Sequence, residues 1–479
     1  VTGNTVFSTE EVLKPLQIAR QGVFSREVLQ RDMLTLTDRY SERGYLFADI
    51  APTINTDREN HIVDVGLEIG EGKQAFLERI EISGNTKTRD KVIRREIPLI
   101  EGDLYNSRLL ARARQNLNNL GYFEDVKVET RRGTSEDRVD VDVAVKEKPT
   151  GSFSLGGGFS SIDGMMGSGS ITQDNFLGLG QRVSLSGQIG SRASRFALNF
   201  FDPHILDTET SLDLSLFNQR LLFNEQVGYN QDIKGGSMAF GRRLYKQLFG
   251  TLGYRYEVNR IFDVNSNAPD EIQDQKGTNT TGRVSVGLSL DLRDNPRDPT
   301  RGFSGSATYQ LAATFLGGEN KFNRFNLELG YYHPLIWKLV GHVRGNLIVA
   351  EPYGGKDLPV QELIYLGGTN TVRGFKTFHL SPIDPATGER IGGNKAIYFN
   401  NEVMFPIYEP LGLRGLLFFD AGNVWTKDES LSLDLRPTAG GGVRVATPFG
   451  LVRVEYGFNL DKRAGEPSGA MHLTVGSTF

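Results

Sequence analysis

The residue best placed to do specific chemistry in this sequence is Arg373, within the tetrapeptide Val372-Arg373-Gly374-Phe375. It lies near the middle of a long polar segment, residues 351–395, between two stretches that alternate apolar and polar residues. Arginine presents its donors in a planar fork and binds carboxylates through paired hydrogen bonds. The tetrapeptide therefore predicts a loop that folds back and places its cation at a specific site.

Two downstream acids are candidate partners for this arginine. Glu402 shares its parity with the polar residues Tyr398 and Asn400, and Asp420 alternates with the apolar Phe419. Because successive side chains of a strand point to opposite faces, both acids are expected on the polar, inward face. The alternative, which spacing alone favours, is an exposed loop arginine beside unrelated acids on the wall.

No catalytic constellation accompanies these charges. The sequence has no GxxxxGK[ST], HExxH or GxSxG motif, and Gly156-Gly157-Gly158 is not followed by a helix that could hold a nucleotide. There are no cysteines, and the six histidines show no metal-ligand spacing. With a net charge of −4, nucleic acid is not an expected partner. We therefore expect neither an enzyme nor a cofactor or metal site.

A long run of alternating strands must position the candidate residues. From residue 150 onward, apolar and polar residues alternate with period two in stretches of about ten residues. Short connections, as at His333-Pro334 and Glu409-Pro410, alternate with long ones, as at 351–395. About 330 residues at roughly 20 per strand and connection give 16 strands. The pattern predicts an all-β, antiparallel, 16-stranded transmembrane barrel over residues 150–479, whereas a soluble sandwich is the alternative fold.

The first 149 residues contain two similar units. Three anchors recur: Val1-Thr2-Gly3-Asn4-Thr5 returns as Ile82-Ser83-Gly84-Asn85-Thr86, Gly44-Tyr45-Leu46-Phe47 as Gly121-Tyr122-Phe123, and His61-Ile62-Val63-Asp64-Val65 as Arg138-Val139-Asp140-Val141-Asp142. Each unit is predicted to follow the order strand, helix, helix, strand, strand, with boundaries at 1–74 and 75–149. A small sheet of this kind leaves an edge that could accept an extended chain.

The two strands that must close the barrel are rich in glycine. The expected first strand, 152–159, contains Gly156, Gly157 and Gly158, and the expected last strand, 471–479, is interrupted by Gly476. Glycine lacks the side chain that stabilises cross-strand pairs. We expect a weak lateral seam that opens, although ordinary barrel glycines are the alternative. Phe479 is expected to anchor the last strand at the membrane interface.

Several of these segments, taken together, resemble the BamA-type assembly factors of bacterial outer membranes. The arginine tetrapeptide, Glu402 and the Asp-x-Gly-x-x-Trp at 420–425 match the family at corresponding positions, and the two units resemble its periplasmic POTRA domains. Further matching segments are Gln173-Asp174-Asn175-Phe176-Leu177-Gly178, Arg293-Asp294-Asn295-Pro296, Pro299-Thr300-Arg301-Gly302 and Val475-Gly476-Ser477-Thr478-Phe479. The resemblance covers essentially the whole chain. It implies that the loop arginine contacts the two inner-wall acids.

The resemblance also implies a function and partners. A BamA-type protein folds and inserts other β-barrel proteins without a nucleotide, by strand pairing at the POTRA edges and at the seam. Its expected partners are unfolded outer-membrane proteins, lipoproteins bound to the POTRA domains, periplasmic chaperones and outer-membrane lipid. Because BamA proteins usually carry five POTRA domains and only two are present here, a two-partner-secretion transporter that exports an unfolded protein remains the alternative. The C-terminal phenylalanine resembles the family's assembly signal.

Overall fold

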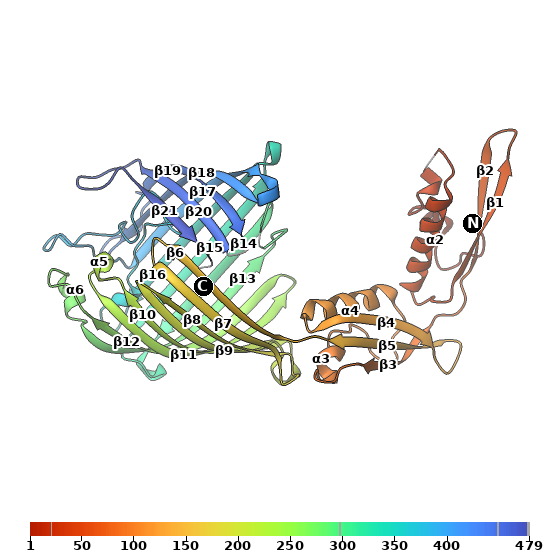
Figure 1. Cartoon of the computed structure of the whole chain (residues 1–479), viewed down its shortest axis with the longest axis horizontal. Helices are drawn as coiled ribbons and strands as arrows, with labels where there is room; N and C mark the ends of the chain where they lie inside the picture. The colour runs from red at the N-terminus through yellow and green to blue at the C-terminus, as the bar shows by residue number, and fades with distance from the viewer. Residues whose placement is uncertain (21, 297, 448–449, 477–479) are drawn as a thin grey trace. The chain divides into compact units, whose positions relative to one another are not determined.

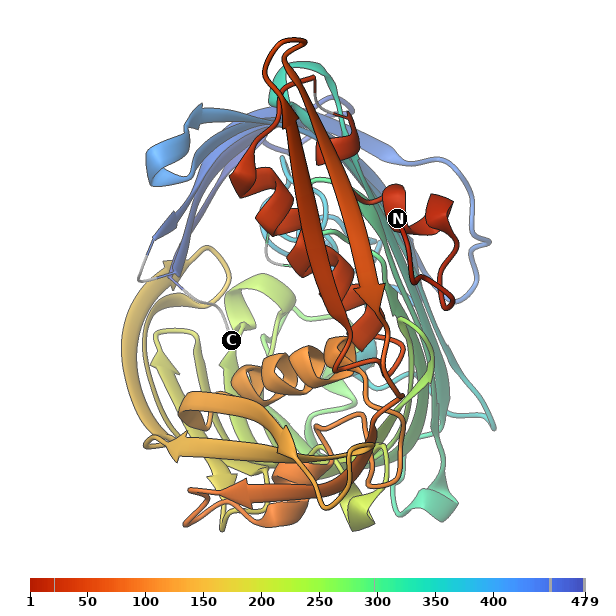
Figure 2. The same ribbon diagram turned by 90° about the vertical axis from the view of Figure 1, so that its right-hand side faces the viewer.

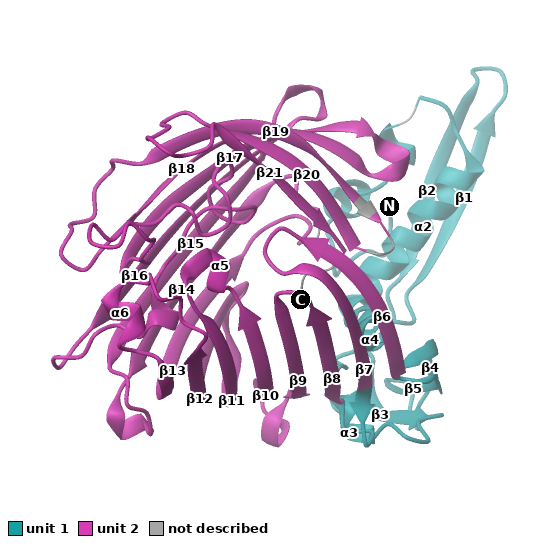
Figure 3. Ribbon diagram, turned by 60° about the vertical axis from the view of Figure 1, so that its left-hand side comes forward, with its two compact units in different colours: residues 1–150, 174–180 teal, residues 151–173, 181–479 magenta. Residues whose placement is uncertain are grey.

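The chain forms two α+β repeats and a β-barrel (Figure 1). The structure is a computed structural model that describes residues 1–20, 22–296, 298–447 and 450–476. Contacts divide the chain into a first unit, residues 1–150 with 174–180, and a second unit, residues 151–173 with 181–479 (Figure 3). The predicted Phe479 anchor lies outside the described residues.

The first repeat packs a long helix against a hairpin. Its elements are α1 (Thr9–Leu13), η1 (Ile18–Arg20), α2 (Arg26–Ser41), β1 (Asp49–Asp57) and β2 (Ile62–Gly70). Ser8 and Glu11 cap α1 reciprocally, and α2 buries Leu36 and Tyr40. Figure 2 shows α2 lying along the β1–β2 hairpin. At the start of the described chain Thr2 forms a parallel bridge with Glu68, and Gly3 follows with φ +80°.

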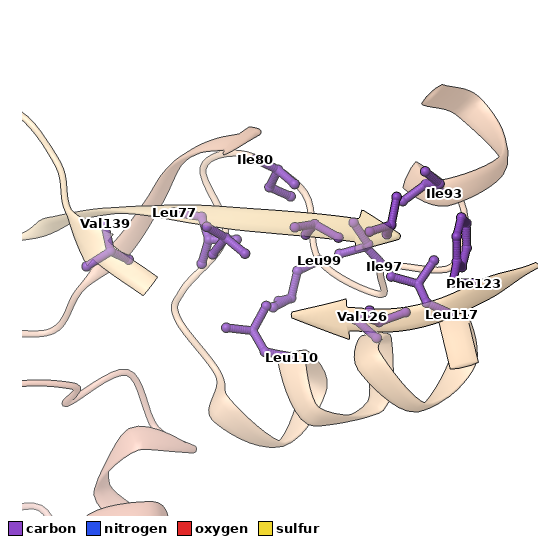
Figure 4. Close-up of a cluster of buried hydrophobic side chains, with 14 of the residues drawn as sticks. Leu77, Ile80, Ile93, Ile97, Leu99, Leu110, Leu117, Phe123, Val126 and Val139 are labelled. Atoms are coloured by element: carbon purple, nitrogen blue, oxygen red, sulfur yellow. The ribbon is translucent and has the colours of Figure 1, made fainter. Parts of the chain in front are cut away.

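The second repeat forms a complete three-stranded sheet. Its elements are β3 (Phe76–Ser83), α3 (Asp90–Arg94), α4 (Ser107–Leu120), β4 (Phe123–Arg132) and β5 (Arg138–Glu147). The strand order is β3-β5-β4, with β3 parallel to β5. Leu110 and Leu117 of α4 pack against Leu77, Val126 and Val139 of the sheet (Figure 4). The helix then ends at Gly121 in the left-handed conformation, φ +74°.

Both repeats close with the same latch between their first and last segments. In each, a glutamate at the end of the last strand accepts hydrogen bonds from the loop that opens the repeat. Glu71 accepts from the amides of Thr5 and Val6 (2.7 and 2.8 Å), and Glu147 accepts from the amides of Lys87 and Thr88 (3.0 and 2.7 Å).

The hydrogen bonds to Glu147 in the second repeat also lower the pKa of this glutamate. Burial opposes ionisation of Glu147, but hydrogen bonds from Thr88, Thr86 and Lys87 outweigh it and lower the pKa to about 2. The carboxylate therefore stabilises the entry of the second repeat in its charged form.

Within the described residues, sixteen antiparallel strands form a closed barrel, which confirms the predicted fold class. They are β6 (Gly151–Ser160), β7 (Gly164–Phe176), β8 (Gln181–Gly190), β9 (Ala193–Asp202), β10 (Thr210–Leu222), β11 (Asn230–Tyr245), β12 (Leu248–Phe262), β13 (Gly277–Asp291), β14 (Gly302–Ala312), β15 (Phe322–Pro334), β16 (Val340–Pro352), β17 (Lys395–Tyr408), β18 (Leu413–Trp425), β19 (Arg436–Thr447), β20 (Gly450–Asn459) and β21 (Gly469–Val475). Outward residues are apolar and exposed, as at Leu329 and Tyr331 of β15.

None of the described helices combines the length and the apolar character needed to cross a membrane.

Candidate functional site

The segment between β16 and β17, residues 353–394, is the candidate site. Three bridges, Ile364 with Gly393, Leu366 with Leu380 and Ile383 with Arg390, give it internal order. Its apolar side chains bury against the inner faces of β17 and β18. The members of this cluster are Ile364, Leu366, Val372, Phe375, Leu380, Ala396, Tyr398 and Val424. The loop therefore has a packed core that fixes where its tetrapeptide points.

Arg373 meets both predicted acids. Its Nε and Nη2 donate to the two oxygens of Asp420, at 2.7 Å each, and its Nη1 donates to Oε1 of Glu402 at 2.6 Å. The backbone amide of Arg373 also donates to Asp420, at 3.0 Å. Only 2% of Arg373 is exposed, and Asp420 is fully buried. This paired geometry between buried groups gives a directional anchor.

The sequence analysis missed three further groups around the arginine. Glu455 of β20 accepts from Arg373 Nη1 at 3.1 Å, and Arg444 of β19 bridges Glu455 and Glu402 at 2.6 and 2.7 Å. The guanidinium also lies 3.7 Å from the ring centroid of Phe418. Glu455 alternates with the apolar Val454 and Tyr456 along its strand, and this pattern could have predicted that it faces inward.

The rest of the tetrapeptide fits closely against the wall. Gly374 has φ +95°, and its amide donates to Nε2 of His472 on β21 at 3.1 Å. A Cβ on Gly457 would lie 2.6 Å from the Gly374 nitrogen, so both positions need glycine. Val372 and Phe375 are buried, and Arg436 stacks over the Phe375 ring at 4.7 Å.

A second anchor of opposite polarity holds the beginning of the loop. Glu362, 6% exposed, accepts from Arg283 Nη1 at 2.8 Å and from Arg324 Nη1 at 3.1 Å. Arg283 also donates to Glu257 at 2.8 Å. The loop thus supplies an anion, Glu362, to arginines on β13 and β15. Eleven positions later it supplies a cation, Arg373, to acids on β17, β18 and β20. The loop sequence has no periodic pattern from which the role of Glu362 could have been predicted.

The lateral seam joins β6 to β21. Among the described residues, β6 and β21 pair only at Ser160 with Thr474 and at Phe159 with Val475, whereas β6 and β7 share ten pairs. β21 spans Gly469–Val475, so it begins two residues before the expected 471; the expected residues 477–479 lie outside the described part of the chain.

The seam glycines have different structural reasons. A Cβ on Gly158 would lie 2.3 Å from the carbonyl oxygen of Val475, and Gly476 has φ +95° with its Cβ position 2.9 Å from the Gly157 oxygen. Among the described residues, Cβ positions on Gly156 and Gly157 would meet ordinary contacts, at 3.4 and 3.5 Å. Close approach of the two strands therefore requires Gly158 and Gly476.

Comparisons with known proteins bear on this geometry. A model described as the Omp85 superfamily domain matches residues 175–479, and a POTRA model described as a surface antigen variable number repeat matches residues 1–72 and 75–148. The chain belongs to the Omp85 superfamily.

Individual relatives of this Omp85 chain are named as assembly factors. The outer membrane protein assembly factor BamA of Nitratidesulfovibrio vulgaris is 29% identical over 100% of this chain and 61% of its own length. The protein of the same name from Neorickettsia risticii is 30% identical over 98% and 64%. The chain therefore spans under two-thirds of the length of these two relatives.

A solved structure shares the Omp85 fold. BamA from Haemophilus ducreyi lacking POTRA domains 1–3 aligns with a TM-score of 0.84 at 23% identity, covering 98% of each chain. The order of two repeats followed by a sixteen-stranded barrel is thus common to both proteins.

Proposed function

We propose that this protein assembles and inserts β-barrel proteins in the bacterial outer membrane, with its two repeats in the periplasm. The observation that carries the proposal is the seam, where β6 meets β21 at Gly158 and Gly476 and, among the described residues, pairs with it at two positions. An unpaired strand edge is a template for an incoming strand.

The seam is easily opened on energetic grounds. Each strand hydrogen bond contributes only about 0.5–1.5 kcal/mol net, and the glycines of β6 add no cross-strand side-chain contacts. A substrate strand that pairs with β6 would replace the bonds lost from β21. The barrel would then act as a template, and folding of the substrate itself would drive insertion.

The anchored loop keeps the remaining wall in place while the seam moves. Its two ion-pair anchors contact β13, β15, β17, β18 and β20, and the Gly374 amide contacts His472 on β21. Export of an unfolded chain through the lumen, the alternative activity, would require the loop to leave these buried contacts. The geometry therefore favours assembly at the seam over transport through the lumen.

The repeats are proposed to receive substrates and partners before the seam does. β1 is exposed along nearly its whole length, and β4 forms an edge of its sheet. Unfolded outer-membrane proteins and periplasmic chaperones are proposed to meet these edges, and assembly-complex lipoproteins are proposed to bind the repeats.

A disulfide across the seam tests the proposal. Phe159→Cys with Val475→Cys joins a register pair, and the chain has no native cysteine to compete. With the protein in lipid vesicles and an unfolded β-barrel protein as substrate, we expect oxidation to abolish substrate insertion and reduction to restore it.

A matched control locks the neighbouring strands instead. Ser154→Cys with Ser170→Cys joins β6 to β7, where the two hydroxyl oxygens are 2.6 Å apart. This disulfide should leave insertion unchanged, because it does not bridge the seam. Full activity of the verified seam-locked protein would refute assembly by lateral opening.

A further inference from the structure

Two short turns of the barrel carry large apolar residues where the backbone disfavours them. In the turn between β9 and β10, Leu206 has φ 52° and ψ 33°, and Asp207 follows with φ 59°. In the turn between β15 and β16, Trp337 has φ 53° and ψ 39°, and Lys338 follows with φ 62°. Two distant segments of the chain thus adopt the same unusual conformation.

Hydrogen bonding identifies both as the same turn type. The amide of Thr208 donates to the carbonyl of Ile205 at 3.1 Å, and the amide of Leu339 donates to the carbonyl of Ile336 at 3.1 Å. With two successive left-handed residues inside each, these are type I′ turns, which ordinarily carry Asn-Gly. A leucine or tryptophan at the first central position is strained, so the fold of the turn does not explain its presence.

Nor does packing explain these residues. Leu206 is 88% exposed and Trp337 is 85% exposed, among the most exposed large apolar side chains described in the protein. Each turn therefore combines a strained backbone with an apolar side chain that no described residue covers. Both features oppose stability in water, and a contact outside the chain would offset both.

The position of the turns identifies that contact. Antiparallel strands alternate in direction, so both turns lie at the end of the barrel where β6 begins. In Figure 3 the turn between β9 and β10 extends beyond the ends of both strands. The strands leading to the turns carry exposed outward residues that form the lipid-facing belt, including Leu198 and Leu216 near the first and Tyr331 and Val343 near the second.

We propose that Leu206 and Trp337 insert into the membrane leaflet at this end of the barrel, at the boundary between headgroups and acyl chains. The occupant is a phospholipid surface, because both tips lie at the ends of strands that carry the outward apolar belt. Tryptophan favours this boundary, and the charged residue after each tip, Asp207 or Lys338, remains on the water side. This inference requires only that the barrel spans a membrane and does not depend on the assembly activity.

Tryptophan fluorescence tests the proposal directly, since the chain contains only Trp337 and Trp425. Trp425 is buried, so Trp425→Phe leaves the turn residue as the single emitter. In phosphatidylcholine vesicles with bromine placed shallow or deep in the acyl chains, we expect shallow bromine to remove most of the emission. Acrylamide in the water should quench weakly.

The opposite pattern, strong acrylamide quenching without bromine quenching, would overturn the proposal and leave a water-exposed turn or a protein-binding one. If Trp425→Phe fails to fold, the same information comes from subtracting the emission of Trp337→Phe from that of the parent protein. Either measurement places the turn in lipid or in water.

Asparagine variants separate a membrane role from a structural one. Asparagine tolerates the left-handed conformation, so Leu206→Asn and Trp337→Asn should unfold in detergent at or above the parent temperature. In bilayers both should lose stability relative to the parent. Leu433→Asn, an 82% exposed leucine in the loop between β18 and β19 at the other end, should be neutral in both media. Equal effects of the turn variants in detergent and bilayer would refute membrane insertion.

Discussion

Replacing Arg373 with alanine should release the loop without unfolding the barrel. The substitution removes a cation that neutralises Asp420, Glu402 and Glu455, each at most 8% exposed. Glu402 and Glu455 keep their ion pairs with Arg444 and Arg453, whereas Asp420 loses its ion pair with Arg373. Breaking a buried ion pair by removing one partner costs about 3–5 kcal/mol. The population of undocked loop should therefore rise by roughly two to four orders of magnitude.

Two further variants set the scale of that effect. Arg373→Lys keeps the charge but loses the paired hydrogen bonds to Asp420, so an intermediate loss of about 1.5–3 kcal/mol is expected. Arg463→Ala removes an exposed arginine 3.9 Å from Asp461 and should change loop stability by less than about 1 kcal/mol.

Hydrogen exchange with mass spectrometry measures these differences in the membrane-embedded protein. Amides of residues 364–380 report opening of the loop, and amides of β13–β16 report opening of the barrel. We expect Arg373→Ala to accelerate exchange in the loop alone and to reduce substrate insertion more than barrel folding. Loop exchange as slow as in the parent would show that apolar packing, not the ion-pair network, holds the loop.

Three other predictions concern separate parts of the chain. Glu362→Gln leaves Arg283 and Arg324 without their shared anion, so hydrogen exchange should accelerate at residues 358–364. Unchanged exchange there would show that Glu362 does not hold the beginning of the loop. Gly158→Ala should push β21 away and accelerate hydrogen exchange at residues 473–475. Gly157→Ala should not, because among the described residues there is room for its Cβ. Equal exchange rates in the two variants would refute the steric account of the seam. Because folding lowers the pKa of Glu147 from its ordinary 4.5 to about 2, its contribution is present above about pH 4.5 and is lost as the pH falls toward 2. Exchange at residues 86–88 should accelerate over that interval in the parent but not in Glu147→Gln.

The sequence predicted the features that depend on regular spacing. Period-two alternation predicted the barrel, and it placed Glu402 and Asp420 on the wall that Arg373 meets. The same parity applied to Glu455, but which strands lie close enough to share one guanidinium depends on barrel closure, which no local pattern contains.

Other features had no local signal. Glu362 lies in a loop without periodicity, so its contact with Arg283 and Arg324 follows only from the three-dimensional path of the loop. The seam glycines predicted weak pairing between the first and last strands. The register in which β6 and β21 meet follows only from closure of the barrel.

The glycines at 156–158 also determine how long a guest strand would stay. Cross-strand side-chain pairs contribute about 0.2–1 kcal/mol each, so three glycines forgo roughly 0.6–3 kcal/mol that a valine-rich edge would offer. Affinity differences of this kind appear mainly in the dissociation rate. A guest on β6 would therefore leave about 3- to 150-fold sooner. Such an edge favours turnover over retention, so one barrel could serve many guests in succession.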